Sequence, residues 1–320
     1  MSHSMSTAFV FPGQGSHSVG MLGALAAADP VVQATFGEAS AVLGYDLWER
    51  VSDGPAEALN PTEIQQPAIL VADIAAWRAW NNVGGPRPDV VLGHSLGEFA
   101  ALVAAGAIGF APAVALVQLR GQLMQSAVPQ GTGGMAAILG LEDAQVREIC
   151  SEAAQGEVVE AVNFNGPGQV VIAGDSAALG RAMALCKERG AKRALPLPIS
   201  VPCHSSLLRD AAARLGEALR REAFSDPAIR FVSPFDVAVH ATGSELPAML
   251  EAQLSSPVRW TETVQYVAKS GATRFVECGP GEVLTGMNKR ILRRHEEIQC
   301  LAFNDPASLE RARASFQEAA

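Results

Sequence analysis

The sequence predicts an α/β protein with a mostly parallel β-sheet covered by helices on both faces, and with a smaller unit inserted into it. Short apolar strands alternate with helical stretches through most of the chain, which is the order that builds a parallel sheet. Between about residues 128 and 199 the order changes to β-α-β-β-α-β, which is typical of a ferredoxin-like unit. The 320 residues, 48% of them hydrophobic, suffice for cores of this size. We therefore predict a large domain from residues 1–127 and 200–320 and a small domain from residues 128–199.

The chain begins with a strand and a glycine-rich turn. Residues 8–11 read as a short strand, and residues 12–16 follow with the sequence Pro-Gly-Gln-Gly-Ser. A nucleotide-binding loop is disfavoured because neither Gly-Lys-Ser/Thr nor Gly-x-Gly-x-x-Gly is present. The segment is either a simple tight turn or a means of placing backbone N–H groups beside the motif at residue 95. Residues 56–80 read as helical pieces broken at Pro61 and Pro67.

One stretch requires a test for a membrane span. Residues 99–118 contain no charged side chain and are long enough to cross a bilayer. However, Gly106, Gly109 and Pro112 divide the stretch, and Pro112 suits the first turn of a new helix. We therefore predict two buried helices joined by a tight turn. No signal peptide is expected, because residues 1–4 lack an apolar segment.

The remaining elements follow from the same patterns of apolar residues and turn residues. The insert is expected to contain strands at 135–141, 158–165, 169–173 and 194–199 and helices at 142–154 and 176–189. After it we expect helices at 207–221, 248–254, 260–269, 283–293 and 309–319, and strands at 229–232, 274–277 and 299–303.

The motif Gly93-His-Ser95-Leu-Gly97 is the main candidate for chemistry. It follows an apolar strand and precedes a helix, which is the context of a nucleophile elbow, where a serine hydroxyl is exposed on a sharp turn. The two glycines allow strand and helix to pass closely. The helix N-terminus behind Ser95 offers free N–H groups to a developing oxyanion. The sequence therefore predicts Ser95 as a nucleophile.

A serine needs a base, and histidine is the usual one. Among six histidines, position favours His204, in a loop before a helix, over His240. His94 adjoins Ser95 and should point to the opposite face. A histidine far downstream of its nucleophile is also the chain order of α/β-hydrolases, so the large domain is expected to be α/β-hydrolase-like.

No acidic residue obviously completes a triad. Glu142 and Asp143 read as helix starts in the insert, and Asp175 reads as a turn residue. A serine–histidine pair oriented by a backbone carbonyl therefore stays open as an alternative.

Arg120 admits two interpretations: a solvated residue at a helix end, or a buried guanidinium that pairs with a substrate carboxylate through two hydrogen bonds. Cys203 is disfavoured as a nucleophile, because it adjoins His204 in sequence. Asn163 and Asn165 are assigned to a hairpin turn.

Composition excludes several classes of protein. A net charge of −9 and a pI of about 5.2 argue against nucleic acid as a partner. The five cysteines are scattered without a Cys-x-x-Cys pair, which fits a reducing cytoplasm and neither disulfides nor a zinc site. No metal and no cofactor are expected.

Taken together, the motifs resemble those of the malonyl-CoA:acyl carrier protein transacylases of bacterial fatty acid synthesis. The resemblance runs from about residue 9 to residue 303 and rests on many motifs in the same order. They are Phe11-Pro-Gly-Gln-Gly-Ser16, Gly93-His-Ser-Leu-Gly-Glu98, Leu119-Arg-Gly121, Gly131-Thr-Gly133, Asn163-Phe-Asn165, Val201-Pro-Cys-His204, Gln253 with Pro257-Val-Arg-Trp260, and Glu277-Cys-Gly-Pro-Gly281.

The resemblance implies roles for single residues. Ser95 would take the malonyl group from coenzyme A and pass it to the phosphopantetheine thiol of acyl carrier protein, with His204 as base. Arg120 would hold the malonyl carboxylate, and the Gln253 backbone carbonyl would orient His204. The backbone N–H groups of Gln14 and Leu96 would form the oxyanion hole. Coenzyme A thioester is then a substrate, and no further cofactor is implied.

Three positions depart from the usual pattern of the family: His17, Cys203 and the pair Pro234-Phe235. Since Cys203 is expected to line the acyl pocket, it leaves the acyl preference open. Rival functions are an acyltransferase of a polyketide or malonate decarboxylase system, and a serine hydrolase or thioesterase on the same elbow. A binding module without catalysis is a third class.

An acidic carrier protein needs a basic surface for docking, and two patches are candidates. One consists of Lys187, Arg189, Lys192 and Arg193, and the other of Lys289, Arg290, Arg293 and Arg294. The chain is expected to be a cytoplasmic monomer that binds neither nucleic acid nor membrane.

Overall fold

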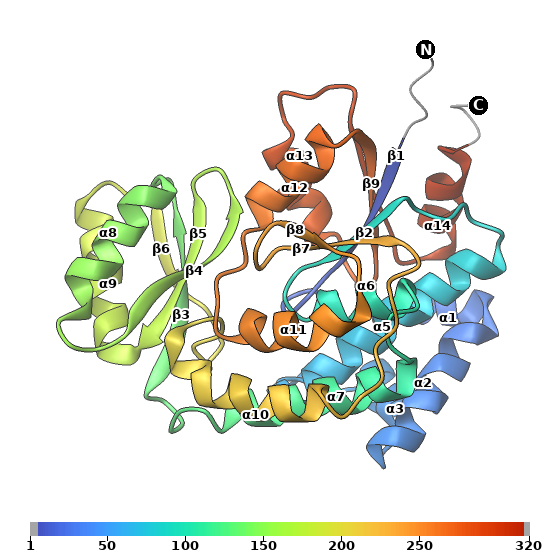
Figure 1. Ribbon diagram of the computed structural model, residues 1–320, viewed down its shortest axis with the longest axis horizontal. Coiled ribbons are helices and arrows are strands. Elements are labelled where there is room, and N and C mark those ends of the chain that lie inside the picture. The colour runs from blue at the N-terminus through green and yellow to red at the C-terminus, as the bar shows by residue number, and fades with distance from the viewer. Residues whose placement is uncertain (1–5, 317–320) are drawn as a thin grey trace.

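The computed structural model describes residues 6–316 and contains two β-sheets, which lie side by side in Figure 1. The larger sheet has the strand order β10-β9-β1-β2-β7-β8, and its neighbouring strands are parallel except for β7 and β8. Its strands are β1 (Ser6–Phe11), β2 (Val90–Gly93), β7 (Arg230–Ser233), β8 (Ala238–His240), β9 (Ala272–Cys278) and β10 (Gln299–Phe303). The predicted α/β class is thus confirmed, and the prediction for residues 1–4 lies outside the described range.

The helices surround the larger sheet and fill the lower half of the molecule in Figure 1. Before the second sheet the chain forms α1 (Gly23–Ala28), α2 (Pro30–Leu43), α3 (Leu47–Ser52), α4 (Ala56–Leu59), α5 (Thr62–Asn82), α6 (Gly97–Ala104) and α7 (Phe110–Gln125). After it follow η1 (Ser206–Leu208), α10 (Arg209–Leu219), η2 (Gly243–Glu245), α11 (Leu246–Leu254), α12 (Trp260–Lys269), α13 (Val283–Ile291) and α14 (Pro306–Ala314).

Alternate residues of β1 face two different cores, as the period of a strand requires. Phe9 and Phe11 belong to the large core that includes α2, α5 and α7, and the Phe9 ring lies 5.3 Å from that of Trp80. Ala8 and Val10 belong to a second core with α12 and α13. Strand β1 is therefore covered on both sides, which explains the continuous apolar run at residues 8–11.

The predicted break at Pro67 is wrong, because α5 continues through it as one helix of 21 residues. Proline removes one intrahelical hydrogen bond and strains the turn before it. Here α5 is buried along most of its length against α2, α6 and α7, so tertiary packing outweighs that local cost. Strand β8, which pairs antiparallel with β7, was not predicted.

The second sheet is antiparallel, with the order β4-β5-β3-β6 that a ferredoxin-like unit requires. Its elements are β3 (Gly133–Leu139), α8 (Asp143–Ala154), β4 (Val159–Gly166), β5 (Gln169–Asp175), α9 (Ser176–Glu188) and β6 (Arg193–Pro196). Helices α8 and α9 cover one face, and Met135 and Val171 on the other face join the large core. The domain limits at residues 128 and 199 stay a prediction.

The uncharged stretch of residues 99–118 forms α6 and α7, two separate buried helices, as predicted. Gly106 lies between them with a left-handed φ of 71°. Across residues 6–316, no helix combines the length and the apolar character that crossing a bilayer demands.

Candidate active site

Ser95 lies on the sharp turn between β2 and α6. Its φ is 55°, a left-handed conformation that side chains other than glycine rarely adopt. A Cβ atom at Gly93 would lie 1.9 Å from the carbonyl carbon of Gly97, and one at Gly97 would lie 2.1 Å from the carbonyl oxygen of Phe11. Both glycines are therefore required for the strand, the turn and the helix to pass this closely.

The structure brings Ser95 and His204 together although 109 positions separate them. The serine Oγ lies 2.6 Å from His204 Nε2. The other ring nitrogen, Nδ1, lies 3.0 Å from the backbone oxygen of Gln253 and 3.1 Å from that of Ser256. Because carbonyl oxygens only accept hydrogen bonds, Nδ1 carries the proton and Nε2 is left to accept the serine proton.

The environment keeps His204 neutral. Burial lowers its pKa to about 3, and the nearby positive charge of Arg120 acts in the same direction. At neutral pH the ring is therefore an unprotonated base beside Ser95. Its backbone is also left-handed, with a φ of 62°. Glu160 on β4 holds the adjoining loop, since its carboxylate accepts from the backbone N–H and from the hydroxyl of Ser206 at 2.7 and 2.8 Å.

Arg120 is fully buried at the site, which rules out a solvated residue at a helix end. Its Nη2 donates to Ser95 Oγ and to Gln253 Oε1, both at 3.1 Å, and its Nη1 donates to Gln66 Oε1 at 2.9 Å. Burial lowers its pKa to about 10, which leaves it charged at neutral pH. No carboxylate oxygen of residues 6–316 lies within 4.0 Å of this guanidinium. A guanidinium in this position can pair with the carboxylate of a bound molecule.

The glycine-rich turn after β1 lies against the elbow. A Cβ atom at Gly13 would lie 2.4 Å from the backbone oxygen of His94, so only glycine permits this approach. The backbone N–H groups of Gln14 and Leu96 find no acceptor within residues 6–316. Two free donors beside a nucleophile are what an oxyanion hole requires.

Comparisons with known proteins identify the family. The family model described as acyl transferase domain matches residues 8–304. A malonyl CoA-acyl carrier protein transacylase of Escherichia coli K12 is 52% identical over 305 residues, which cover 95% of this chain and 98% of the relative. An acyl carrier protein S-malonyltransferase of Vibrio cholerae, solved by crystallography, is 53% identical, with a TM-score of 0.93 over 96% of this chain and 99% of that one.

This chain belongs to the malonyl-CoA:acyl carrier protein transacylase family. The predicted family, enzyme class and fold are thereby confirmed. A further solved relative is a malonyl-transacylase in complex with a type II polyketide acyl carrier protein. It is 50% identical, with a TM-score of 0.95 over 97% of this chain and 99% of the other.

The cleft of this transacylase is a cavity of about 130 Å³ between the two sheets. Gln14, Ser95 and His204 line it, and α13 contributes part of its wall. From the second sheet and the segment after it come Met135, Asn163, Asn165, Val171, Leu197 and Ile199. Cys203 also lines the cavity, as predicted. Burial raises the pKa of its thiol to about 11, so the thiol is neutral.

The assignment of Asn163 and Asn165 to a hairpin turn is wrong. Both lie on β4 and are buried at the cleft, where Asn165 Oδ1 accepts from His94 Nε2 at 2.8 Å. The residues alternate along a strand, so both point to the same face, which is the face that meets the elbow. The predicted strand at 158–165 already included both residues, and its period of two is the signal that could have placed them on one face.

The other candidates from the sequence lie elsewhere. His240 is on β8 and contacts Asp236. Glu142 caps α8, and Asp175 accepts from the backbone N–H of Val158. Within residues 6–316, no carboxylate is hydrogen-bonded to His204, and no three metal-binding side chains cluster.

Sequence reasoning missed the polar groups behind the reacting pair. Gln66 holds Arg120, and the Gln253 side chain donates from Nε2 to the backbone oxygen of Ser95 at 2.7 Å and to Glu98 Oε1 at 2.9 Å. Gln66 and Glu98 lie on helices that read as apolar core. A fully buried charged or amide residue within an apolar helix is the signal that could have found them.

Proposed function

We propose that this enzyme transfers a malonyl group from malonyl-CoA to the phosphopantetheine thiol of acyl carrier protein, for fatty acid synthesis, through a malonyl ester of Ser95. The observation that carries the proposal is the position of one hydroxyl, Ser95 Oγ, 2.6 Å from His204 Nε2 and 3.1 Å from Arg120 Nη2. A base activates this oxygen while a buried cation stands beside it to hold the substrate carboxylate.

In the first half of the reaction, Ser95 Oγ attacks the thioester carbonyl while its proton passes to His204 Nε2. The backbone N–H groups of Gln14 and Leu96 stabilise the negative charge that develops on the carbonyl oxygen. The carbon–sulfur bond then breaks, and the coenzyme A sulfur leaves with the proton from His204. The backbone carbonyls that accept from Nδ1 keep the ring in the required tautomer throughout.

The second half repeats these steps with a different thiol. The carrier's phosphopantetheine thiol gives its proton to His204, and its sulfur attacks the malonyl ester. The carbon–oxygen bond breaks, and Ser95 Oγ recovers the proton from His204. No metal or cofactor takes part in this sequence of steps.

The serine is tested directly by intact mass spectrometry. We expect wild-type protein mixed with malonyl-CoA to gain the mass of one malonyl group, and Ser95→Ala to gain none, because within residues 6–316 no other hydroxyl or thiol is hydrogen-bonded to His204 Nε2. Ser16→Ala, a serine in the neighbouring turn, serves as the control and should keep the adduct. An adduct on the Ser95→Ala protein would show that the nucleophile is wrong.

Two rival functions share this site. A thioesterase would release free malonate quickly in the absence of carrier, whereas the transacylase should hold the malonyl ester until a thiol arrives. An acyltransferase of a polyketide or malonate decarboxylase system would use the same chemistry with another carrier. The solved relative in complex with a polyketide carrier keeps that alternative open, and a transfer assay with purified carriers decides it.

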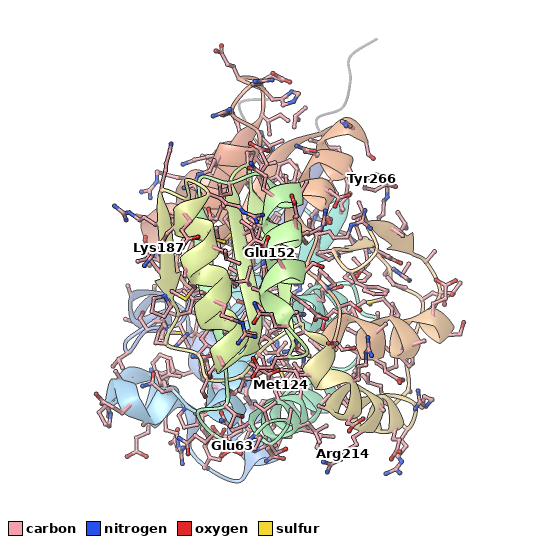
Figure 2. The ribbon with its side chains drawn as sticks, turned by 90° about the vertical axis from the view of Figure 1, so that its left-hand side faces the viewer. Glu63, Met124, Glu152, Lys187, Arg214 and Tyr266 are labelled. Carbon is pink, nitrogen blue, oxygen red and sulfur yellow. The ribbon has the colours of Figure 1, made fainter. Side chains whose placement is uncertain are left out.

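Of the two basic patches, the one on α13 and the residues after it suits carrier docking better. Helix α13 lines the cleft through Val283, Leu284 and Met287 and carries Lys289 and Arg290 on its last turn. The other patch lies on the outer side of the second sheet, where Figure 2 shows Lys187 on α9 and Glu152 on α8. There Arg189 is already paired with Glu152. The long arm of the carrier must enter the cleft, so a docking surface beside it is favoured.

A salt series tests the α13 patch. Arg293→Glu with Arg294→Glu should raise the KM for acyl carrier protein and flatten its dependence on salt, because a docking charge is lost. The KM for malonyl-CoA and the transfer to free pantetheine should change little. Lys187→Glu is the matched control, and an equal effect of Lys187→Glu would move the docking surface to the second sheet. The cytoplasmic location and the monomeric state of the enzyme stay predictions.

A further inference from the structure

A chain of hydrogen bonds leads from Arg120 to a buried carboxylate that plays no part in the steps above. Glu98 follows the elbow on α6 and is fully buried. Its Oε1 accepts from Gln253 Nε2 at 2.9 Å, and its Oε2 accepts from the hydroxyl of Ser233 at 2.6 Å. On the other side of the same amide, Gln253 Oε1 accepts from Arg120 at 3.1 Å. One amide therefore stands between a buried anion and a buried cation.

The orientation of that amide is fixed. The two protons of Gln253 Nε2 are both used, because the nitrogen donates to Glu98 and to the backbone oxygen of Ser95. The amide oxygen must then face Arg120. The direct acceptors of Arg120 are all neutral, namely Gln66, Gln253 and Ser95. Glu98 is the buried carboxylate whose charge acts on this guanidinium through space.

We propose that Glu98 is a positioning residue that sets how tightly Arg120 holds the substrate carboxylate. The Gln253 amide links the two side chains, and the charge of Glu98 acts on Arg120 across it. An ionised Glu98 opposes the arrival of a second carboxylate at Arg120, and a protonated Glu98 does not. The inference rests on the proposed function, since it assumes that Arg120 binds the malonyl carboxylate.

The surroundings of Glu98 move its ionisation to near neutral pH. Burial raises its pKa to about 7, although hydrogen bonds from Ser233 and Gln253 and the charge of Arg120 oppose the rise. The charged groups that act on it are Arg120 from α7 and Asp236 from the segment after β7. Strands β1 and β2 and helix α5 also pack on α6. Within residues 6–316, none of these three elements contributes a charged group that shifts the pKa of Glu98.

A competition between two substrates tests this proposal. Wild-type enzyme receives equal amounts of malonyl-CoA and acetyl-CoA without carrier, is quenched early, and is analysed for malonyl- and acetyl-enzyme by intact mass from pH 6 to 8.5. Both substrates use the same nucleophile, base and leaving group, so the pH dependence of these shared groups cancels in the malonyl-to-acetyl ratio. We expect the malonyl-to-acetyl ratio to fall about fivefold as pH rises and Glu98 ionises.

Two variants separate the charge of Glu98 from its shape. Glu98→Gln keeps an acceptor for Gln253 but has no charge, so its ratio should stay at the low-pH value of the wild type at every pH. Ser233→Ala removes one hydrogen bond to the carboxylate, so the fall in the ratio should move to higher pH. Glu251→Gln is the control, because this residue lies on the same helix as Gln253 and pairs with Arg220 at the surface. Its ratio and pH profile should match the wild type.

The outcomes that contradict the two proposals are distinct. If the ratio of Glu98→Gln keeps the pH dependence of the wild type, Glu98 does not control how tightly Arg120 binds the carboxylate. The same conclusion follows if Ser233→Ala leaves the midpoint pH of the fall in the ratio unchanged. A wild-type ratio that is high and independent of pH has the same meaning. If instead Arg120→Ala fails to lower the ratio, Arg120 does not bind the carboxylate and the proposed function is wrong at that residue. If Glu98→Gln does not fold, the shift of the midpoint pH in Ser233→Ala tests the role of Glu98 by itself.

Discussion

At the scale of single residues, Arg120 should decide which acyl group the enzyme accepts. Its guanidinium lies beside Ser95, and no carboxylate of residues 6–316 lies within 4.0 Å of it, so a direct ion pair can form only with a substrate that carries a carboxylate. We expect Arg120→Ala to lower kcat/KM for malonyl transfer by about a hundredfold or more, and that for acetyl transfer by much less. Parallel assays with the two thioesters measure this difference. An equal loss for both would mean that Arg120 only supports the fold of the site.

The same scale shows what a sequence reveals about a site. Ser95 and His204 could be predicted from residue type and position, because a nucleophile elbow has local requirements that Gly93 and Gly97 express. The role of Gln253 could be predicted only from the family resemblance. Its local sequence does not indicate that its backbone carbonyl will lie beside the imidazole of a residue distant in the chain. Glu98 was not found, because its neighbours Gln253 and Ser233 come from elements that only the fold brings to it.

At the scale of elements, the loop that carries His204 depends on a strand of the other sheet. Glu160 on β4 accepts two hydrogen bonds from Ser206, and this contact anchors the loop two residues after the left-handed His204. We expect Glu160→Ala to lower kcat by about tenfold or more for malonyl and acetyl transfer alike, because a misplaced base slows both. Glu160→Gln, which retains an acceptor, should recover much of the rate. A changed malonyl-to-acetyl ratio would contradict this interpretation.

Elements were predicted well where local patterns are strong and less well where packing decides. The elbow strand, α6, α7 and the ferredoxin-like order follow from apolar periodicity and glycine positions. The break expected at Pro67 did not occur, because neighbouring helices enclose α5 on most sides. Strand β8 has three residues and gains its conformation from pairing with β7, so the sequence gives it no signal of its own.

At the scale of the whole molecule, a buried acid lowers the stability of the fold as pH rises. Asp73 on α5 is fully buried, and neither carboxylate oxygen has a hydrogen-bond partner among residues 6–316. Burial, with a smaller contribution from Glu277, raises its pKa well above the ordinary value of 3.8. The folded state therefore binds this proton more tightly than the unfolded state. The stabilising contribution is complete below about pH 4 and is lost as pH rises toward the pKa of the folded state.

We expect Asp73→Asn to gain stability relative to the wild type as pH increases, because the amide has no proton to lose. The difference in the free energy of unfolding should grow by up to about 1.4 kcal/mol per pH unit above pH 4, until the folded carboxyl itself ionises. Urea unfolding of both proteins from pH 5 to 8 measures it. Asp53→Asn, at an exposed position, should show no such trend. A difference that does not vary with pH would contradict the explanation.

The left-handed backbone of the two reacting residues has a consequence for how this protein can evolve. Ser95 and His204, with φ values of 55° and 62°, each occupy a conformation that costs a residue with a side chain about 1–3 kcal/mol. Glycine would relieve that strain at either position and would abolish the reaction. Selection for heat resistance alone would thus favour replacements that inactivate the enzyme, so durability has to be gained at positions remote from the cleft.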